Sequence, residues 1–600
     1  MEYTQTFERQ SFLDARGYTI LMACPGSGKT TSIAFKMKSI IDELQHATNG
    51  YGGLACLSFT NVACDEYRSK FNELHESTLS FPHTISTIDS FITQNIVLPF
   101  AYLFGCPAKI RILNDNEELA NVYKQTYIQD GERKEAIVPP LRRFGRLAHT
   151  KRPEFCSIDL DGYKWNGSLI EADNERNYAK ACIRWRFEKG IITSQDALYI
   201  ACCILRYNED IARALAKRFP YIIIDEAQDT SALQMKFFEL LRTHGVQNME
   251  FVGDLSQSIY GWNNAKPELL ETLSHQDDFS VLHFTECRRS VQPIIDIYSK
   301  LKIVGEPRIV STGVENKNCP IIVYRYDENG EIDVMRQFVR KCEEFELKDK
   351  LILARGKDEV NKLSGGKSRI DLWKSSVPYN LINSKIAYDD GKYSEAIRFL
   401  RYVWTDCLFD KYAYEEKKQF LSSLENDVDS NCQLLDLIQA LPSLHKSFSE
   451  WQDESENLLQ EKLNLEHRPD FDRKSRLVGQ TMRELLNENV DNYFGIVEDA
   501  TDYRNNVETI HLAKGASVDA VLLFLSTDNR GANISLNLFP DQGQHVNEMT
   551  EKHRLVYVAC SRAKQFLAFA VRSDVTEETI RQKLGEHVTI ISNGIQLGLF

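Results

Sequence analysis

The stretch GYTILMACPGSGKT at residues 17–30 constrains the fold of this chain more than any other. Residues 20–24 are apolar and predict a buried strand, the small residues after them predict a tight loop, and the lysine and threonine predict the start of a helix. In a strand–loop–helix unit of this kind, the helix N-terminus points at a bound phosphate. The pattern therefore predicts an α/β fold with a phosphate site beside its first strand.

The loop carries residues suited to a nucleotide. Its small residues let backbone N–H groups turn inward onto a β-phosphate, and Lys29 can reach the β- and γ-phosphates. Thr30 can offer its hydroxyl to Mg²⁺, so ATP and Mg²⁺ are the expected cofactors; the alternative is an ordinary glycine turn before a helix. The predicted nucleotide-binding residues of this loop are Ala23 (where the general pattern has glycine), Pro25, Gly26, Ser27, Gly28, Lys29, Thr30 and Thr31.

A second apolar strand, in YIIIDEAQD at 221–229, ends in acidic residues. Asp225 can hold the Mg²⁺ shell while its neighbour Glu226 polarises an attacking water, and a solvated strand end is the alternative. In a chain that already has a phosphate loop, these carboxylates predict ATP hydrolysis. Lys29, Asp225 and Glu226 are the first catalytic candidates.

The spacing of these two motifs predicts an insertion. Lys29 and Asp225 lie about 200 positions apart, roughly twice what a compact nucleotide-binding core needs. Strand patterns restart after 320, and the stretch around EEKKQFLSSLEN and LVGQTMRELLNEN is rich in helix formers. The predicted domains are one ATP-binding lobe at 1–95 and 191–280 with an insertion at 96–190, and a second lobe at 281–384 and 496–600 with a compact insertion at 385–495, both insertions being mainly helical.

Composition excludes several classes of protein. The sequence has no run of 18 apolar residues and a polar, acidic N-terminus, so neither a membrane span nor a signal peptide is expected. The 14 cysteines form no CxxC pair, which argues against a disulfide scaffold or a zinc site and is typical of a cytoplasmic protein. The net charge of −14 is a weak argument against a nucleic-acid partner, because a groove can be basic or aromatic while outer faces are acidic.

With DEAQD the sequence becomes more specific than a general NTPase: it resembles superfamily 1 DNA helicases of the UvrD/Rep/PcrA type, and the matching motifs follow one another along nearly the whole chain. That family has two RecA-like P-loop domains, so the resemblance implies parallel sheets flanked by helices, each domain interrupted by an insertion. The matching segments are ACPGSGKT at 23–30, LSFTNVACDEYRSKF at 57–71, ISTIDSF at 85–91, DEAQD at 225–229, GDLSQSIYGW at 253–262, CRRS at 287–290, VETIHLAKGASVDAVLL at 507–523 and EKHRLVYVACSRAK at 551–564.

The resemblance implies further roles around ATP. Gln10 would read adenine through its side-chain amide. Gln257 would sense the γ-phosphate, and Arg289 and Arg562 would contact it from the second lobe, where arginines stabilise the charge of the transition state. A structural salt bridge is the alternative for each arginine.

The resemblance also implies a set of DNA contacts. Aromatic side chains can stack on bases of a single strand without reading sequence, although ordinary core packing is the alternative for them. The basic run at 142–152 could touch DNA or be a solvated surface. The residues implied in DNA binding are Phe59, Thr60, Asn61, Thr87, Tyr260, Trp262, His511 and Lys514, of which the last two would couple the DNA groove to the ATP cleft.

Three of the matching motifs depart from the family pattern. Ser517 stands where the family has a ribose-holding glutamate, Asn263 and Asn264 replace arginine and glycine, and Cys287 and Arg288 precede Arg289 where asparagine and tyrosine are usual. The catalytic lysine, carboxylates and arginines are present, so hydrolysis is expected, while ribose binding and DNA affinity could differ from those of other members.

The function that the resemblance implies is a DNA-stimulated Mg²⁺-ATPase that moves 3′ to 5′ on single-stranded DNA, for example in repair. The alternative is an ATP- and DNA-gated regulatory subunit that licenses a partner nuclease in antiviral defence. The short second insertion and the departures at 263 and 517 favour that alternative, since compact helicase-like subunits such as the Gabija type look similar. An ATPase unrelated to nucleic acid is a third reading.

Overall fold

The structure is a computed structural model that describes residues 6–76, 78–113, 116–129, 132–259, 265–328, 330–364, 373, 375–389, 391–409, 414–471, 489–490, 506–531, 533–540 and 548–592. Tyr260, Trp262 and Asn263 lie outside these residues. The chain divides into two compact units. The first comprises Met1–Arg325, Phe345–Asp349 and Ala513–Ser592, and the second comprises Tyr326–Glu344, Lys350–Leu512 and Asn593–Phe600.

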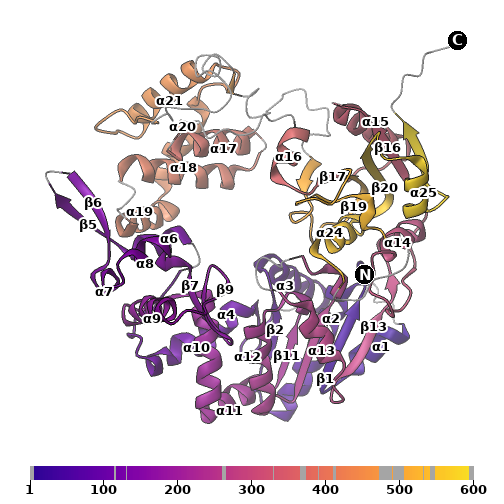
Figure 1. The fold of residues 1–600 in the computed structure, drawn as a ribbon, viewed down its shortest axis with the longest axis horizontal. Coiled ribbons are helices and arrows are strands. Elements are labelled where there is room, and N and C mark those ends of the chain that lie inside the picture. Colours follow the sequence, from indigo (N-terminus) through magenta and orange to yellow (C-terminus); the bar gives the residue numbers. More distant parts are fainter. Residues whose placement is uncertain are drawn as a thin grey trace. The chain divides into compact units, whose positions relative to one another are not determined.

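A parallel six-stranded sheet forms the centre of the first unit (Figure 1). Parallel strands buried on both faces are apolar throughout, as in the run of residues 221–224. The strand order in this sheet is β13 (Ser280–Phe284), β1 (Tyr18–Ala23), β12 (Asn248–Gly253), β11 (Tyr221–Ile224), β2 (Leu54–Ser58) and β3 (Thr84–Thr87).

Helices cover both faces of this sheet, because alternate strand residues point to opposite sides. Ile223 packs into one core with residues of α1 to α3, and Ile222 packs into the other with residues of α4 and α10 to α12. The flanking helices are α1 (Phe7–Asp14), α2 (Lys29–Ala47), α3 (Asn61–His75), α4 (Ile88–Ile92), α10 (Ser194–Tyr207), α11 (Glu209–Arg218), α12 (Ala232–Thr243) and α13 (Pro267–Ser274).

Strand β13 corrects one predicted boundary. Ser280 to Phe284 pair in parallel with Thr19 to Ala23 of β1, so the whole strand belongs to the first sheet. The predicted division between residues 280 and 281 would cut it. The five residues of this short strand do not indicate which sheet it joins, and only the pairing with β1 decides this.

The first insertion has its own core, built around Leu141, Tyr178 and Cys182. It contains small antiparallel sheets as well as helices, so it is less helical than predicted. Asp130 and Gly131 stand between two of its strands in the sequence, a dipeptide typical of a two-residue hairpin turn. Its elements are β4 (Arg111–Leu113), α6 (Asn116–Val122), β5 (Lys124–Gln129), β6 (Glu132–Ile137), α7 (Pro139–Arg142), α8 (Arg146–Thr150), β7 (Cys156–Asp159), β8 (Gly162–Trp165), β9 (Ser168–Leu169), α9 (Asp173–Glu188) and β10 (Ile191–Thr193).

The C-terminal part of the first unit contributes strands of a second sheet. Neighbouring strands there are β19 (Val518–Phe524), β20 (Ala563–Arg572), β16 (Ile322–Tyr326) and β21 (Thr589–Ser592). Helices α14 (Gln292–Ser299), α24 (Glu551–Cys560) and α25 (Glu577–Leu584) accompany them, with β14 (Glu286–Cys287) and β15 (Val310–Ser311) paired nearby.

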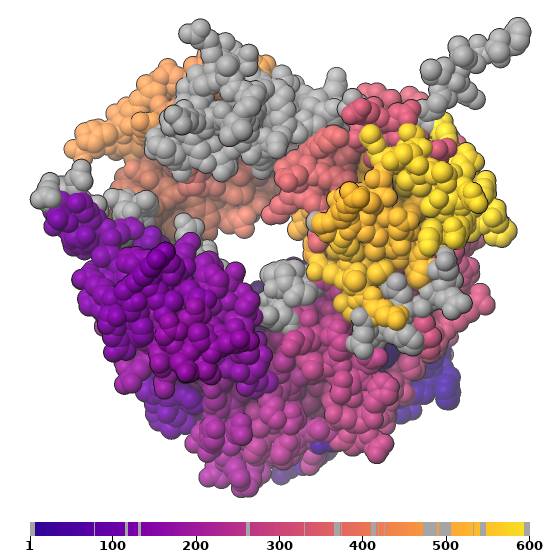
Figure 2. All heavy atoms as spheres, viewed as in Figure 1, coloured from indigo at the N-terminus to yellow at the C-terminus, as the bar shows by residue number. Residues whose placement is uncertain are grey.

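This late segment packs against much earlier parts of the chain. The ring of Tyr298 in α14 meets that of Tyr557 in α24 edge to face, with their centroids 5.2 Å apart. In Figure 2 the yellow atoms of the segment after Ala513 lie against the rose-coloured atoms of the chain around α14.

The fold class predicted from the sequence, α/β with parallel sheets flanked by helices, is confirmed.

The second unit is mainly helical, as predicted for residues 385–495 as far as the structure describes them. Its helices share a core around Leu400, Leu434 and Trp451. The elements are α15 (Glu331–Glu344), β17 (Lys350–Ala354), α16 (Lys357–Leu363), α17 (Val377–Asp389), α18 (Tyr393–Leu408), α19 (Tyr414–Asn426), α20 (Val428–Ala440), α21 (Phe448–Lys462) and β18 (Val507–Thr509). Of the helices in the described residues, none has the length and apolar character that a membrane crossing would require.

Candidate nucleotide-binding site

The loop between β1 and α2 adopts a conformation that requires glycine. Gly26 and Gly28 have φ angles of 70° and 85°, in the left-handed region. A Cβ atom on Gly26 would lie 2.4 Å from Cβ of Arg289, so the segment around residue 289 packs directly on the loop. The backbone N–H of Arg288 donates to the carbonyl of Gly26 over 2.9 Å. The predicted strand–loop–helix unit is therefore present, with Lys29 as the first residue of α2.

The position of Ala23 explains why this loop can have alanine where the general pattern has glycine. Ala23 is the last residue of β1 and lies in the core, 2% exposed, where its φ is not positive and glycine is not needed. Pro25 is buried behind it. The hydroxyl of Ser27 is buried and has no hydrogen-bond partner among the described residues. Thr30 and Thr31 are half-buried in the first turn of α2.

Asp225 and Glu226 follow β11 and face the loop lysine. The Nζ atom of Lys29 lies 3.8 Å from Oε1 of Glu226. Asp225 is 6% exposed, and in the described part of the chain its Oδ1 atom accepts no well-formed hydrogen bond, although the hydroxyl of Tyr67 is near enough to favour its ionised form. Burial, together with the negative charge of Glu226, raises the pKa of Asp225. A buried carboxylate oxygen without a well-formed hydrogen bond fits a divalent cation, which takes oxygen ligands.

The side chain of Glu226 is fixed by its neighbours. Its backbone has a φ of 52°, an uncommon left-handed conformation for a residue with a side chain, at the start of the turn η4 (Ala227–Asp229). The amide of Gln228 donates to Oε2 of Glu226 over 2.5 Å, and its own oxygen accepts from the backbone N–H of Asp254 over 3.1 Å. Gln228 fits there because Gly253 has no side chain; a Cβ would lie 2.4 Å from the Gln228 oxygen.

Lys514, which the resemblance assigned to DNA, lies against these carboxylates. Its Nζ atom is 2.5 Å from Oδ2 of Asp229 and 3.5 Å from Oε2 of Glu226. Burial alone would raise the pKa of Glu226, but the positive charges of Lys29 and Lys514 outweigh it and lower that pKa. The pKa of Lys29 is raised in turn, since the carboxylates of Glu226 and Asp225 outweigh the effect of burial.

The two candidate arginines, Arg289 and Arg562, come from different segments of the first unit. Arg562 is 3% exposed, and its Nη2 atom donates to Oε1 of Gln257 over 3.0 Å. Gln257 donates to Oδ2 of Asp254 over 2.7 Å, and the Tyr557 hydroxyl donates to the same oxygen over 3.2 Å. Burial, followed by the positive charge of Arg289, lowers the pKa of Arg562, which indicates that the two guanidinium groups are close.

Arg289 is positioned by both ends of its segment. Its Nη1 atom donates to the carbonyl of Ser561 over 3.2 Å, and the hydroxyl of the next residue, Ser290, donates to the carbonyl of Ala563 over 2.6 Å. Residues 287–290 therefore join the phosphate loop to the segment that carries Arg562. The predicted residues Lys29, Asp225, Glu226, Gln257, Arg289 and Arg562 are brought together around one loop.

The candidate DNA contacts are less uniform. The hydroxyls of Thr60 and Thr87 cap the N-termini of α3 and α4, accepting from Ala63 and Ser90, while Asn61 is exposed. Phe59 lies on the wall of a cavity of about 390 Å³ that residues of the first insertion also line. His511 is half-buried in the second unit. DNA binding by these residues stays a prediction.

Gln10 lies on α1, where its amide donates to both carboxylate oxygens of Asp14 over 2.8 Å. Gln228, Asp229 and Asp254 also lie at the site and were not among the residues predicted from the sequence. Gln228 and Asp229 belong to the motif DEAQD. A three-residue turn after Glu226 brings Asp229 back beside it, and the short spacing within the motif could have indicated this. No sequence pattern indicated that the side chain of Gln228 would pack against Gly253 and bond to the backbone of Asp254.

Comparison with known proteins matches most of the chain to one family. Residues 4–278 match the model of the UvrD/REP helicase N-terminal domain, and residues 406–574 match that of the UvrD-like helicase C-terminal domain. These two domain models fit the two RecA-like domains predicted from the sequence.

Individual relatives agree with this match. A Mycoplasma pneumoniae protein named probable DNA helicase is 24% identical over 320 residues, 50% of this chain and 55% of that protein. A second one, named probable DNA helicase II homolog, is 22% identical over 621 residues, 93% of this chain and 82% of the relative. The ATP-dependent DNA helicase PcrA of Staphylococcus aureus is 22% identical over 641 residues, 94% of this chain and 83% of PcrA.

Proposed function

Because the chain belongs to the UvrD-type superfamily 1 helicases, we propose that it hydrolyses ATP with Mg²⁺, is stimulated by DNA, and moves 3′ to 5′ along single-stranded DNA. The observation that carries this proposal is the convergence of Lys29, Glu226 and Arg562 on one phosphate loop. These residues come from three distant segments, and each has the charge that its proposed role needs.

Nucleotide binding would begin at the phosphate loop. The turned N–H groups at Gly26 and Gly28 and the N-terminus of α2 favour an anion, and the ammonium of Lys29 adds a positive charge beside them. Thr30 and Asp225 would hold Mg²⁺, which supplies charge neutralisation on the phosphate oxygens. The hydroxyl of Ser27, buried without a partner in the described residues, is a further donor for a phosphate oxygen.

Hydrolysis would depend on the groups around Glu226. The carboxylate is ionised, and the Gln228 amide orients one of its oxygens, so the other can accept a proton from the attacking water. Arg289 and Arg562 stay charged at neutral pH and lie close to the loop, where they would stabilise the charge on the leaving phosphate. Gln257 links Arg562 to Asp254 and thereby couples the arginine to strand β12.

A DNA-dependent step would act through the segment that contains Lys514. This lysine pairs with Asp229 and Glu226 and stands three residues after His511, which the family resemblance implies in the DNA groove. A displacement of this segment on DNA binding would change the charge next to the proposed base. ATP hydrolysis would then respond to DNA without a direct contact between DNA and nucleotide.

The test is the ATPase rate of the purified chain with and without Mg²⁺, alone and with single-stranded, duplex, 3′-tailed and 5′-tailed DNA, with strand displacement scored on the same substrates. We expect no hydrolysis after EDTA, strong stimulation by single strands, and displacement only from the 3′-tailed duplex. Absence of stimulation by any DNA would contradict the proposal.

Two outcomes separate the finer alternatives. Displacement from the 5′-tailed duplex alone would reverse the proposed polarity. Stimulation by DNA without any displacement, together with nuclease activity only in the presence of a co-purifying subunit, would favour the role of a licensing subunit for a nuclease over that of a motor.

A further inference from the structure

Arg9 is a buried charged residue for which neither the sequence motifs nor the comparisons provide a role. It lies in α1, next to Gln10, and is 7% exposed. Its Nη2 atom donates to the carbonyl oxygen of Ser27 in the phosphate loop over 2.8 Å. The same guanidinium lies over Gly28, where a Cβ atom would be only 2.7 Å from Nη2. Arg9 therefore contacts the loop at two consecutive residues.

The geometry of a peptide bond gives this contact a consequence. In a planar trans peptide the C=O of one residue and the N–H of the next point in opposite directions. When Arg9 holds the Ser27 carbonyl on the side of α1, the N–H of Gly28 must point to the other side of the loop. An arginine suits this task because its planar guanidinium carries several donors in fixed directions and does not lose its charge.

Helix α1 is itself fixed at both of its ends. At its start, the carboxylate of Glu8 accepts from the backbone N–H of Thr285 over 2.8 Å. At its end, the ammonium of Lys36 donates to the carbonyl of Phe12 over 2.6 Å and lies over the Phe12 ring at 4.3 Å. Arg9 thus extends from a helix that is held to the residue after β13 and to α2.

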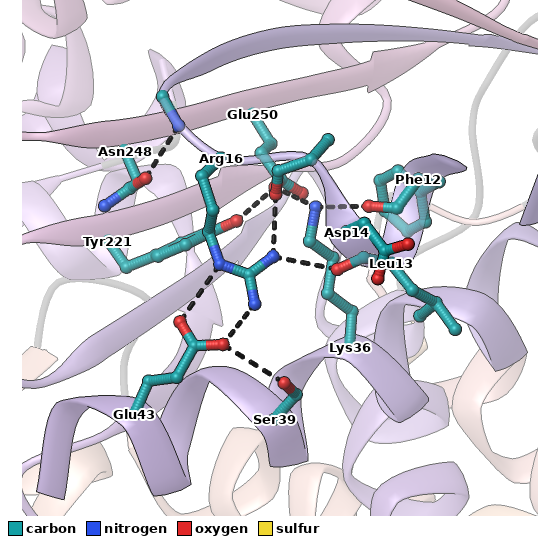
Figure 3. A network of polar contacts seen from close by, with 12 residues as sticks. Phe12, Leu13, Asp14, Arg16, Lys36, Ser39, Glu43, Tyr221, Asn248 and Glu250 are labelled. Atoms are coloured by element: carbon teal, nitrogen blue, oxygen red, sulfur yellow. Dashed lines mark hydrogen bonds and ion pairs between the residues drawn. The ribbon is translucent and has the colours of Figure 1, made fainter. Parts of the chain in front are cut away.

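The anchor at Lys36 is a buried polar network (Figure 3). Lys36 forms an ion pair with Glu250 of β12, the hydroxyl of Tyr221 donates to the same carboxylate, and both members of the ion pair are at most 1% exposed. Breaking a buried ion pair by removing one partner is costly, so this network keeps the end of α1 in one place. Arg9 can then hold the loop without moving itself.

We propose that Arg9 is a positioning residue for nucleotide binding, which orients the Ser27–Gly28 peptide so that the Gly28 N–H faces the phosphates. This inference rests on the proposed ATPase function and names a part of its binding site. Because the contact is with the loop and not with a base, its effect is the same for every nucleoside triphosphate. Gln10, one residue away and implied in adenine recognition, should behave differently.

The experiment compares the KM and kcat of DNA-stimulated hydrolysis for ATP and for GTP in the wild type, Arg9→Met, Arg9→Lys and Gln10→Ala. We expect Arg9→Met to raise KM about tenfold or more for both nucleotides while kcat stays within about threefold, because a hydrogen bond from a charged donor is lost. Arg9→Lys keeps one donor and should give an intermediate KM, whereas Gln10→Ala should raise KM for ATP alone.

Arg213→Met is the matched control, since Arg213 is an exposed arginine that pairs with Glu209 on α11 and does not touch the loop or α1. Its KM should equal that of the wild type. A KM for ATP within twofold of the wild type in Arg9→Met, or an increase seen with ATP but not with GTP, overturns the inference. If Arg9→Met does not fold, Arg9→Lys decides on the same two criteria. A wild-type chain that hydrolyses neither nucleotide overturns the proposed function itself.

Discussion

The Nζ atom of Lys514 lies 3.5 Å from Oε2 of Glu226, the carboxylate proposed to activate water, and the same ammonium lies 2.5 Å from Asp229. With Lys29 on its other side, Glu226 is flanked by two positive charges that lower its pKa. A carboxylate with a lowered pKa is a weaker base, because it binds a proton less tightly. We therefore propose that Lys514 weakens Glu226 as a base for as long as the two side chains stay paired.

Replacing Lys514 should weaken the dependence of hydrolysis on DNA. In Lys514→Ala the positive charge next to Glu226 is removed, so the pKa of Glu226 rises and its basicity increases. We expect the ATPase rate without DNA to rise several-fold. The upper limit is about 10-fold, the factor that corresponds to one pKa unit. The ratio of the rates with and without DNA should fall by the same factor. The measurement is kcat with and without saturating single-stranded DNA.

Lys514→Arg and Lys236→Ala serve as controls for this prediction. Arginine keeps the charge beside Glu226 and should keep the stimulation factor, and Lys236 pairs with Glu239 on the surface of α12, away from the site. If the ratio of stimulated to unstimulated rates in Lys514→Ala equals that of the wild type, Lys514 does not restrain Glu226.

Glu226→Gln should separate binding from chemistry. Glutamine has nearly the same size but cannot accept a proton from water, and the loss of a positioned base typically lowers kcat by about 10²–10⁴. ATP binding should persist in this variant, whereas Lys29→Ala should lose both binding and turnover. Wild-type turnover in Glu226→Gln would remove the assignment of this residue as the base.

Arg562→Ala should also keep ATP binding while hydrolysing much more slowly. Arginines that contact a transferring phosphate contribute about 10³–10⁵ in well-studied NTPases. Gln257→Ala removes the acceptor for Nη2 of Arg562 and should give a smaller loss of kcat, because the guanidinium remains but is less well oriented. An unchanged kcat in Arg562→Ala would show that the guanidinium does not act on the leaving phosphate.

The raised pKa of Asp225 predicts how ATPase activity should depend on pH. Its pKa is raised above the ordinary aspartate value, because it is buried beside Glu226, and its ionised form is the one that would hold Mg²⁺. As the pH falls toward the raised pKa, Asp225 gains a proton, so kcat/KM should decline on the acidic side at a higher pH than an ordinary aspartate would give. A profile that stays flat down to about pH 4, the ordinary pKa of aspartate, would contradict this role.

The same raised pKa predicts a stability gain in Asp225→Asn. Since the folded state disfavours the ionised carboxylate, that charge costs stability at neutral pH, and the cost declines from the folded-state pKa downward and is gone below the ordinary pKa of aspartate. We expect Asp225→Asn to have a higher Tm than the wild type at neutral pH, with a difference that shrinks on acidification, and no ATPase activity. A lower Tm at neutral pH would mean that Asp225 stabilises the fold.

Contiguous patterns were enough to predict the elements that carry the candidate site. The strand, loop and helix at residues 17–30 and the acidic end of β11 depend on hydrophobicity and on glycine, which act between close neighbours in the chain. The same local reasoning predicted the helices of residues 385–495 and failed at β13, because the five residues SVLHF do not indicate which of the two sheets they join. The hairpin β5–β6 was not predicted either, although the sequence has Asp130 and Gly131, a dipeptide typical of hairpin turns, between the two strands.

Contacts between distant segments could not be derived in that way. Lys514 belongs to a motif that resembles a DNA-coupling segment, yet its ammonium lies beside Glu226 because the chain returns to the first unit at Ala513. Arg9 acquires a role only when α1 is anchored to Thr285 and Lys36 and reaches the Ser27 carbonyl. Residue types set which charges and conformations are available, whereas packing and strand register set which of them meet, since a side chain's direction depends on the position of the whole element that carries it.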